Sequence, residues 1–326
     1  MINIRAVKCK SIGTTRQIFT KLQALHFGKY YIEVGLIFMN TILRSSILYA
    51  CETYYNLKES EIRQLEQIEE SLMRKLLKTT RGCPIMQIYC EMGQIPARFE
   101  IIKLRLLFLK YILNQKSDSK ILRFFYLQIE KPVKNDWAST CRKDLKKLRI
   151  NLSFEDMKNM HKKEYKNLIR NKCRQSAYEY LMSKRGTKGQ EITYTEIQTA
   201  DYLLPNNKLN IEDQREIFAI RNRMVNIPSN FISREKNMNR CVCGVKEEME
   251  HIYECTELNM KKVEVRYEQI FNGTITEQKK ILERFKENLK MRSILKENTT
   301  NHVILSCDPL PPCDNRGVAM ELKINK

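Results

Sequence analysis

Residues 61–77 read EIRQLEQIEESLMRKLL, and their apolar positions recur at intervals of three and four. This spacing places the apolar side chains on one face of an α-helix and leaves the charged side chains on the other. Asn56, followed three residues later by Glu59, has the pattern of a capping box, so we predict one long helix to about Lys78. The repeating positions are Ile62, Leu65, Ile68, Leu72 and Leu76.

The rest of the chain favours the same kind of structure. It has 326 residues but only 10 glycines and 8 prolines, which favours a mostly helical protein. The last residues, 298–326, lack a helical period, and we predict a disordered C-terminal tail there. Further helices are predicted over 14–52 with a break at Gly28, over 85–92 and 96–113, from Asn210 to a stop at Pro228, and from a Thr274–Glu277 cap to about Lys296.

The predicted helix over 96–113 has basic borders. Its apolar stripe comprises Phe99, Ile102, Leu106, Leu109 and Leu113. Arg98 and Arg105 lie along one border of the stripe, and Lys103 and Lys110 along the other. These cations either face phosphates or are simply solvated, as on an ordinary amphipathic helix.

The net charge of the chain indicates which class of partner it binds. The chain carries 58 Lys and Arg against 38 Asp and Glu, a net charge of +20, which suits a polyanion such as RNA or DNA. Its longest apolar runs are too short or too interrupted by charge to span a bilayer, so we predict no membrane partner. Met1 is not followed by the apolar core of a signal peptide, and we expect an intracellular protein of the nucleus or cytoplasm, not a secreted one.

Over half of the net charge lies in one segment. Residues 131–188 contain 17 basic and 6 acidic residues, a difference of +11, interleaved with Trp137 and several tyrosines. Concentrated charge of one sign favours contact with a phosphate backbone, although a solvated helical linker would look similar. The predicted nucleic-acid-binding residues are Arg142, Lys143, Lys146, Lys147, Lys162, Lys163, Arg170, Lys172 and Arg174.

A second stretch, CVCGVKEEMEHIYEC over 241–255, predicts a metal site. Three thiolates and one imidazole suit tetrahedral Zn²⁺ and leave no position for a catalytic water, so the zinc would be structural. Gly244 would let the backbone bend so that amides point at the sulfurs. The other cysteines are scattered, which argues against disulfides in a reducing compartment. The predicted ligands are Cys241, Cys243, His251 and Cys255.

Several of these segments resemble a known family. The stretches ILYACETYYNL from Ile47, the helix from Glu61 and CPIMQIYCEMGQIPARFEIIKLRLLFLKYIL from Cys83 are similar to the region after the palm in reverse transcriptases of LINE-type non-LTR retrotransposons. FAIRNRMVNIPSNF from Phe218, followed by the Cys-Cys-His-Cys stretch, resembles the motif found downstream of the thumb in that family.

The resemblance implies a helical thumb-like bundle over 1–130 and supports a helical region over 191–297 with the zinc module at about 240–257. Composition adds a basic helical linker over 131–190 and the tail over 298–326. No Asp-Asp pair occurs in the chain, so we predict no catalytic residues and no polymerase activity. We expect a nucleic-acid-binding part of a reverse transcriptase, with no small-molecule substrate. Open alternatives are a zinc-containing scaffold for protein partners, an accessory that complements a palm or a ribonucleoprotein in trans, and a relic of a decayed element.

Overall fold

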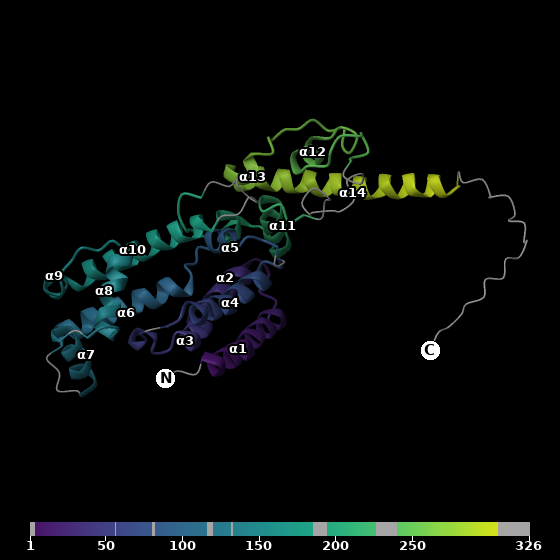
Figure 1. Cartoon of the computed structure of the whole chain (residues 1–326). Helices are drawn as coiled ribbons and strands as arrows, with labels where there is room; N and C mark the ends of the chain where they lie inside the picture. The colour runs from purple at the N-terminus through teal and green to yellow at the C-terminus, as the bar shows by residue number, and fades with distance from the viewer. Residues whose placement is uncertain are drawn as a thin grey trace, which may run out of the picture. The chain divides into compact units, whose positions relative to one another are not determined.

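The computed structural model describes residues 4–55, 57–79, 82–115, 120–131, 133–184, 194–225 and 240–305 (Figure 1). Within these ranges the chain forms helices and two isolated β-bridges but no strand, which confirms the mostly α prediction. The α-helices are α1 (Ile4–Ala24), α2 (Tyr31–Phe38), α3 (Arg44–Ile47), α4 (Glu59–Leu76), α5 (Ile85–Glu91), α6 (Ala97–Asn114), α7 (Lys120–Glu130), α8 (Trp137–Lys147), α9 (Phe154–Asn159), α10 (Lys162–Ser183), α11 (Ile211–Arg221), α12 (Met249–Glu254), α13 (Gln269–Asn272) and α14 (Ile275–Leu305).

The chain divides into two compact units. Unit 1 comprises residues 1–226 and 268–282, and unit 2 comprises 227–267 and 283–326. The predicted thumb-like segment and the predicted basic linker therefore both fall within unit 1. None of the described helices combines the length and the apolar character needed to cross a bilayer.

Helix ends follow local sequence signals. The predicted break at Gly28 is present, with φ of +54° at this glycine between α1 and α2. Asn210 caps α11 by accepting a hydrogen bond from the N–H of Asp213 at 2.8 Å. Helix α4 begins later than predicted, because its capping carboxylate is that of Glu61, which accepts from the N–H of Lys58 at 2.8 Å. Asn56, the predicted cap, lies outside the described residues.

Helix α14 confirms the predicted start of the last helix. The carboxylate of Glu277 accepts from the N–H of Thr274 at 2.7 Å, as in a capping box. The helix continues to Leu305, beyond the predicted end near Lys296, and so includes the first residues of the predicted tail. Residues 306–326 of that tail lie outside the described residues.

Helix α6 lies at the centre of unit 1. Helices α4, α7, α8, α9 and α10 all pack against it, and α10 runs alongside it (Figure 1). The predicted apolar stripe is buried, and Ile101 and Ile112 on the other side of the helix are buried as well. A helix covered on nearly all sides cannot present a basic border to solvent.

The arginines of the α6 borders are structural, contrary to both readings of the sequence. Arg98 is buried and donates from Nε and Nη2 to the two carboxylate oxygens of Glu66 at 2.6 and 2.9 Å. Arg105 is buried in an ion pair with Asp144 of α8. Burial of a guanidinium requires such a partner, and each one was supplied by a distant helix.

The lysines of α6 are also withdrawn from solvent. Lys110 is buried, and its Nζ donates to three backbone carbonyls at the C-terminal end of α9. These are carbonyls that a helix end leaves without partners, so one ammonium group closes α9 against α6. Lys103 is half-buried and pairs with Glu100 one helical turn before it.

The basic segment is part of the fold and is not a linker. Helix α10 buries a continuous stripe along α6, and Trp137, at the start of α8, is fully buried and donates from Nε1 to the carbonyl of Glu52 at 2.7 Å. The segment thus contributes core as well as charge. The buried stripe of α10 consists of Tyr165, Ile169, Cys173, Ala177 and Leu181.

Candidate metal centre and basic surface

The four predicted metal ligands converge in unit 2. The thiol sulfurs of Cys241, Cys243 and Cys255 and a ring nitrogen of His251 all lie within 4.8 Å of one another. The sulfurs of Cys241 and Cys255 are 3.7 Å apart, and the sulfur of Cys243 is 3.2 Å from Nε2 of His251. This cluster can hold a metal ion.

A tight turn brings the first two cysteines together. The N–H of Cys241 donates to the carbonyl of Val245 at 2.7 Å, and the N–H of Gly244 donates to the carbonyl of Cys241 at 2.9 Å. Gly244 has φ of +84°, a backbone conformation that residues other than glycine rarely adopt, so this position requires glycine. The N–H of Cys243 points at the sulfur of Cys241, as the sequence predicted.

The second pair of ligands comes from one helical turn. His251 lies in α12, and Cys255 follows its last residue, with the N–H of Cys255 donating to the carbonyl of His251 at 2.8 Å. A spacing of four residues therefore turns both side chains to the same side. Cys241 and Cys255 are buried, whereas Cys243 and His251 lie nearer to the surface.

The thiol pKa values of Cys241 and Cys243 are shifted in opposite directions. Burial raises the pKa of Cys241 to about 12, mainly because a thiolate there would lose its hydration. Burial also opposes ionisation of Cys243, but the N–H of Val245 and the neighbouring thiols outweigh it and lower the pKa of Cys243. The amides of the turn thus favour the thiolate form that metals bind.

Helix α14 supports the loop through three side chains that the sequence reasoning missed. Arg292 donates from Nε and Nη2 to the two carboxylate oxygens of the buried Glu247, each at 2.8 Å. Asn288 donates from Nδ2 to the carbonyls of Ile252 and Tyr253 at 2.7 and 3.0 Å, which closes the end of α12.

Arg284 completes this support. Its Nε donates to the carbonyl of Tyr253 at 2.8 Å, and its Nη1 donates to the carbonyl of Lys261 at 2.8 Å. Arg284, Asn288 and Arg292 are four residues apart, so they form one stripe along α14. This repeat of polar residues beside the apolar positions was the signal available in the sequence.

The predicted phosphate-binding residues lie on the surface of unit 1. All nine are exposed except Lys172, which is half-buried. Four of them already have contacts within the chain: Arg142 with the carbonyl of Ile129, Lys143 with Asn135, Lys147 over the ring of Phe99, and Arg174 with the carbonyl of Ile197. Lys146, Lys162, Lys163 and Arg170 have no ion-pair partner in the part of the chain that the structure describes.

The arginine at the end of α11 has a structural role. Arg221 is buried in unit 1, where its Nε donates to Oε1 of Glu91 at 3.0 Å. Its Nη1 donates to the carbonyls of Ile270 and Phe271 at 2.6 and 2.7 Å, at the end of α13. Burial alone would lower the pKa of Arg221, but the Glu91 carboxylate outweighs it and raises that pKa. Arg221 therefore ties α11 to α5 and α13.

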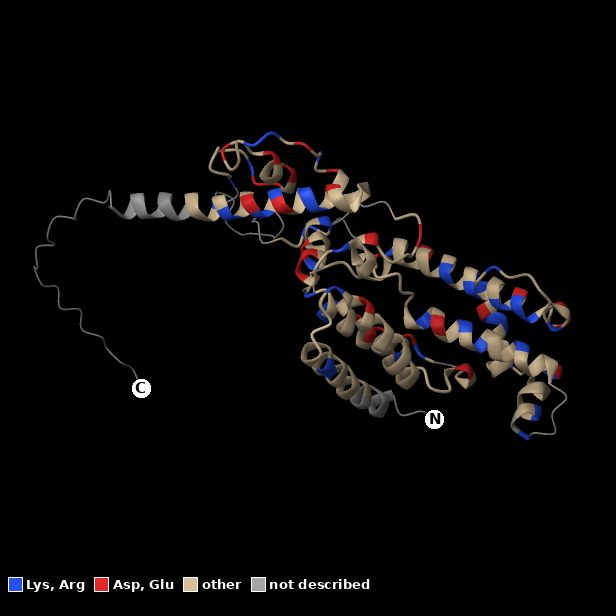
Figure 2. Cartoon of the chain, turned by 180° about the vertical axis from the view of Figure 1, so that it is seen from behind, with Lys and Arg blue, Asp and Glu red and all other residues tan. Residues whose placement is uncertain are grey.

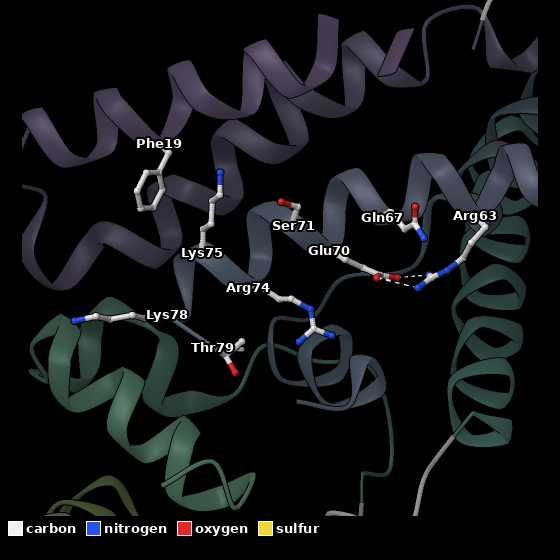
Figure 3. A pocket seen from close by; sticks show the side chains of 9 residues that line it. All are labelled: Phe19, Arg63, Gln67, Glu70, Ser71, Arg74, Lys75, Lys78 and Thr79. Atoms are coloured by element: carbon white, nitrogen blue, oxygen red, sulfur yellow. Dashed lines mark hydrogen bonds and ion pairs between the residues drawn. The ribbon is translucent and has the colours of Figure 1, made fainter. Parts of the chain in front are cut away.

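A pocket of 840 Å³ lies between α1 and α4 in unit 1, and Figure 3 shows its lining. Several of its cations are engaged within the chain. Arg63 donates to both carboxylate oxygens of Glu70, Arg74 donates to the carbonyl of Cys83 at 3.0 Å, and Lys75 lies 5.6 Å from the ring centre of Phe19. Cations in the last turn of α4 also complement the negative end of the helix dipole. The pocket suggests no reaction.

We compared the chain with protein-family models, with curated proteins and with solved structures, and none of the three comparisons found a match.

Proposed function

We propose that this protein binds RNA or DNA through the phosphate backbone, using the exposed basic surface of α8, α9 and α10. The observation that carries the proposal is an excess of exposed charge over residues 137–184. Twelve Lys and Arg are exposed there, against the four exposed acids Glu155, Asp156, Glu164 and Glu179. The exposed cations are Arg142, Lys143, Lys146, Lys147, Arg149, Lys158, Lys162, Lys163, Lys166, Arg170, Arg174 and Lys184.

Helix α10 carries part of this charge in a line, and its Lys and Arg are blue in Figure 2. Lys163, Lys166, Arg170 and Arg174 are separated by three, four and four residues, so they follow one side of the helix next to its buried stripe. The line is roughly 16 Å long at about 1.5 Å per residue. Successive phosphates of a nucleic-acid strand could meet this line without reading any base, which is the contact that positions a backbone.

We propose further that the ion held by the Cys-Cys-His-Cys cluster is zinc, in a structural role. Zinc at about 2.3 Å from each thiolate would hold two sulfurs about 3.8 Å apart in tetrahedral geometry, which is close to the 3.7 Å between Cys241 and Cys255. Three thiolates and one imidazole fill four positions. The metal would fix the loop against α14, and the basic helices would hold the ligand.

The resemblance to LINE-type reverse transcriptases supports a more specific proposal, in which the chain positions template or product nucleic acid for a polymerase and does not itself polymerise. The thumb-like and metal-binding segments occur in the order that this family has. A protein-interaction scaffold is the competing proposal, and it predicts a partner that remains bound after nuclease treatment.

A charge-removal variant tests the nucleic-acid proposal. Lys163→Gln, Lys166→Gln and Arg170→Gln combined remove three exposed cations, of which none has an ion-pair partner in the described part of the chain. Affinity for labelled RNA and DNA is measured by fluorescence anisotropy over a series of salt concentrations. Because each neutralised phosphate contributes a slope of about 0.7 to 0.9 in log K against log salt, the variant should lower the slope by roughly 2 to 3.

The matched control removes three exposed cations from other helices of unit 1, with Arg16→Gln, Lys21→Gln and Lys279→Gln combined. This control should keep nearly all of the wild-type affinity and slope. Absence of binding to any nucleic acid at low salt, or equal losses in both triple variants, would refute the proposed surface.

A further inference from the structure

We propose that α7, together with Tyr111 of α6, forms an aromatic platform on which unpaired bases stack, so that the nucleic acid is single-stranded where it crosses this part of unit 1. The inference rests on the proposed function and names the kind of nucleic acid involved. We define the platform as Tyr111, Phe124 and Leu127.

The platform is the outer end of a chain of aromatic rings. Trp137 is fully buried, and its ring centre lies 4.8 Å from that of Phe125, which is also buried. Phe108 lies 5.4 Å from Phe125 and 6.1 Å from Tyr111, whose ring is nearly parallel to its own. Phe124 lies 5.5 Å from Phe125. Phe124 is therefore held by a buried ring and Tyr111 by the half-buried Phe108, so both rings need little ordering when a ligand binds.

The outer members are unusually open to solvent for side chains of their type. Phe124 is 54% exposed, Tyr111 48% and Leu127 46%. Burial of each would be favourable, and a group of exposed apolar side chains marks a surface that binds a partner. Helix α7 buries Phe125 toward α8 and leaves this face without a cover in the described part of the chain.

Charge indicates which class of partner fits. Lys120 and Arg123 on α7 and Lys131 and Lys134 after it are exposed, and Glu130 is the one exposed acid among the described residues of 120–136. A basic rim around aromatic rings suits a strand that offers both phosphates and base faces. A buried base in a duplex cannot reach a ring without leaving its stack, so the platform selects unpaired bases.

The platform also adjoins the proposed phosphate-binding surface. Helices α7 and α8 pack together, and Arg142 of α8 donates from Nη2 to the carbonyl of Ile129 in α7 at 3.5 Å. Lys143, the next residue, donates to Asn135 in the connection between the two helices at 3.1 Å. A strand whose phosphates follow α8 could therefore place its bases on α7.

Phe124→Ala tests the platform, with Tyr49→Ala as the matched control because Tyr49 is 77% exposed and belongs to no ring cluster among the described residues. Affinities for a labelled 12-nucleotide single strand and for a hairpin duplex are measured by anisotropy at one salt concentration. We expect Phe124→Ala to weaken single-strand binding about five- to a hundredfold, the range for loss of one stacked base, and to change duplex binding less than about twofold. Tyr49→Ala should change neither. Fluorescence of the buried Trp137 verifies the fold of each variant.

The outcomes separate this inference from the proposed function. Photocrosslinking of a thiouracil-substituted strand to the Tyr111 or Phe124 peptide would support the platform directly. If the wild type binds nucleic acid but Phe124→Ala affects single strand and duplex alike, or neither, the platform is refuted and the proposed function stands. If the wild type binds neither ligand, the proposed function fails. If it sediments with anionic lipid vesicles and Phe124→Ala abolishes only that, the surface serves a membrane and the inference is refuted.

Discussion

Arg221→Met is expected to be the most informative single change to the fold. Glu91 is buried with no exposed side-chain area, and Arg221 is the cation that faces it. Methionine fills similar space without charge, so the variant leaves a buried carboxylate whose remaining donors are the hydroxyls of Tyr194 and Tyr202, at 2.8 and 2.6 Å. Removing one partner of a buried ion pair costs about 3–5 kcal/mol, and we expect the free energy of unfolding of unit 1 to fall by that amount.

A second variant separates charge from packing. Arg221→Met combined with Glu91→Gln replaces the unpaired carboxylate by an amide, whose oxygen can still accept from one tyrosine hydroxyl while its NH2 donates to the oxygen of the other. The double variant should therefore recover roughly 2 kcal/mol of the loss. The carbonyls of Ile270 and Phe271 keep no donor from Arg221 in either variant, so recovery should be incomplete.

Urea denaturation provides the measurement. The chain has a single tryptophan, and Trp137 is fully buried in unit 1, so its fluorescence reports the unfolding of that unit. Free energies follow from the linear dependence on urea, compared at equal slope. A loss below about 1 kcal/mol in Arg221→Met, or a double variant no more stable than the single one, would refute the view that this pair holds α5, α11 and α13 together.

Two further predictions concern pH and metal. Burial raises the pKa of Tyr202 well above 10, so above pH 10 the unfolded chain releases this proton while the folded chain retains it. The stability that is present below pH 10 is therefore lost as the pH rises, at about 1.4 kcal/mol per pH unit for each such group. Denaturation midpoints between pH 9 and 11 should show this fall, Tyr202→Phe should reduce its slope, and Tyr49→Phe should not. Cys255→Ser should remove bound zinc, measured by metal analysis, and lower the helical circular dichroism while leaving Trp137 fluorescence unchanged, because structural zinc contributes on the order of 10 kcal/mol to its own module. Retention of zinc, or the same losses in Lys262→Ala at an exposed site of unit 2 outside the module, would contradict the assignment.

The helices could largely be predicted because their signals are local. The spacing of apolar residues in α4, the break at Gly28 and the caps at Asn210 and Thr274 each depend on neighbours in sequence. The same spacing could not show that α6 is covered on nearly all sides. In the sequence, Arg98 and Arg105 look like solvated residues at the border of the stripe. In the structure they pair with Glu66 and Asp144 of other helices, and no local pattern predicts such pairs.

The two candidate sites were predictable to different degrees for the same reason. The cluster from Cys241 to Cys255 closes within 15 residues, so its ligands could be recognised before any fold was known. Its support from Arg284 and Arg292 depends on how α14 meets the loop. The exposure of aromatic residues such as Phe124 could likewise not be predicted, because the sequence does not tell which ring of an aromatic pair is buried.

The contacts of the stripe formed by Arg284, Asn288 and Arg292 depend on the spacing of these residues along α14 more than on the composition of the rest of the helix. Residues on the opposite side of this helix could change widely without touching the metal loop. One inserted or deleted residue between positions 284 and 292 would turn the following contacts by about 100° around the axis and detach Glu247 from Arg292. Over these two helical turns, the chain should therefore tolerate substitutions far better than changes of length.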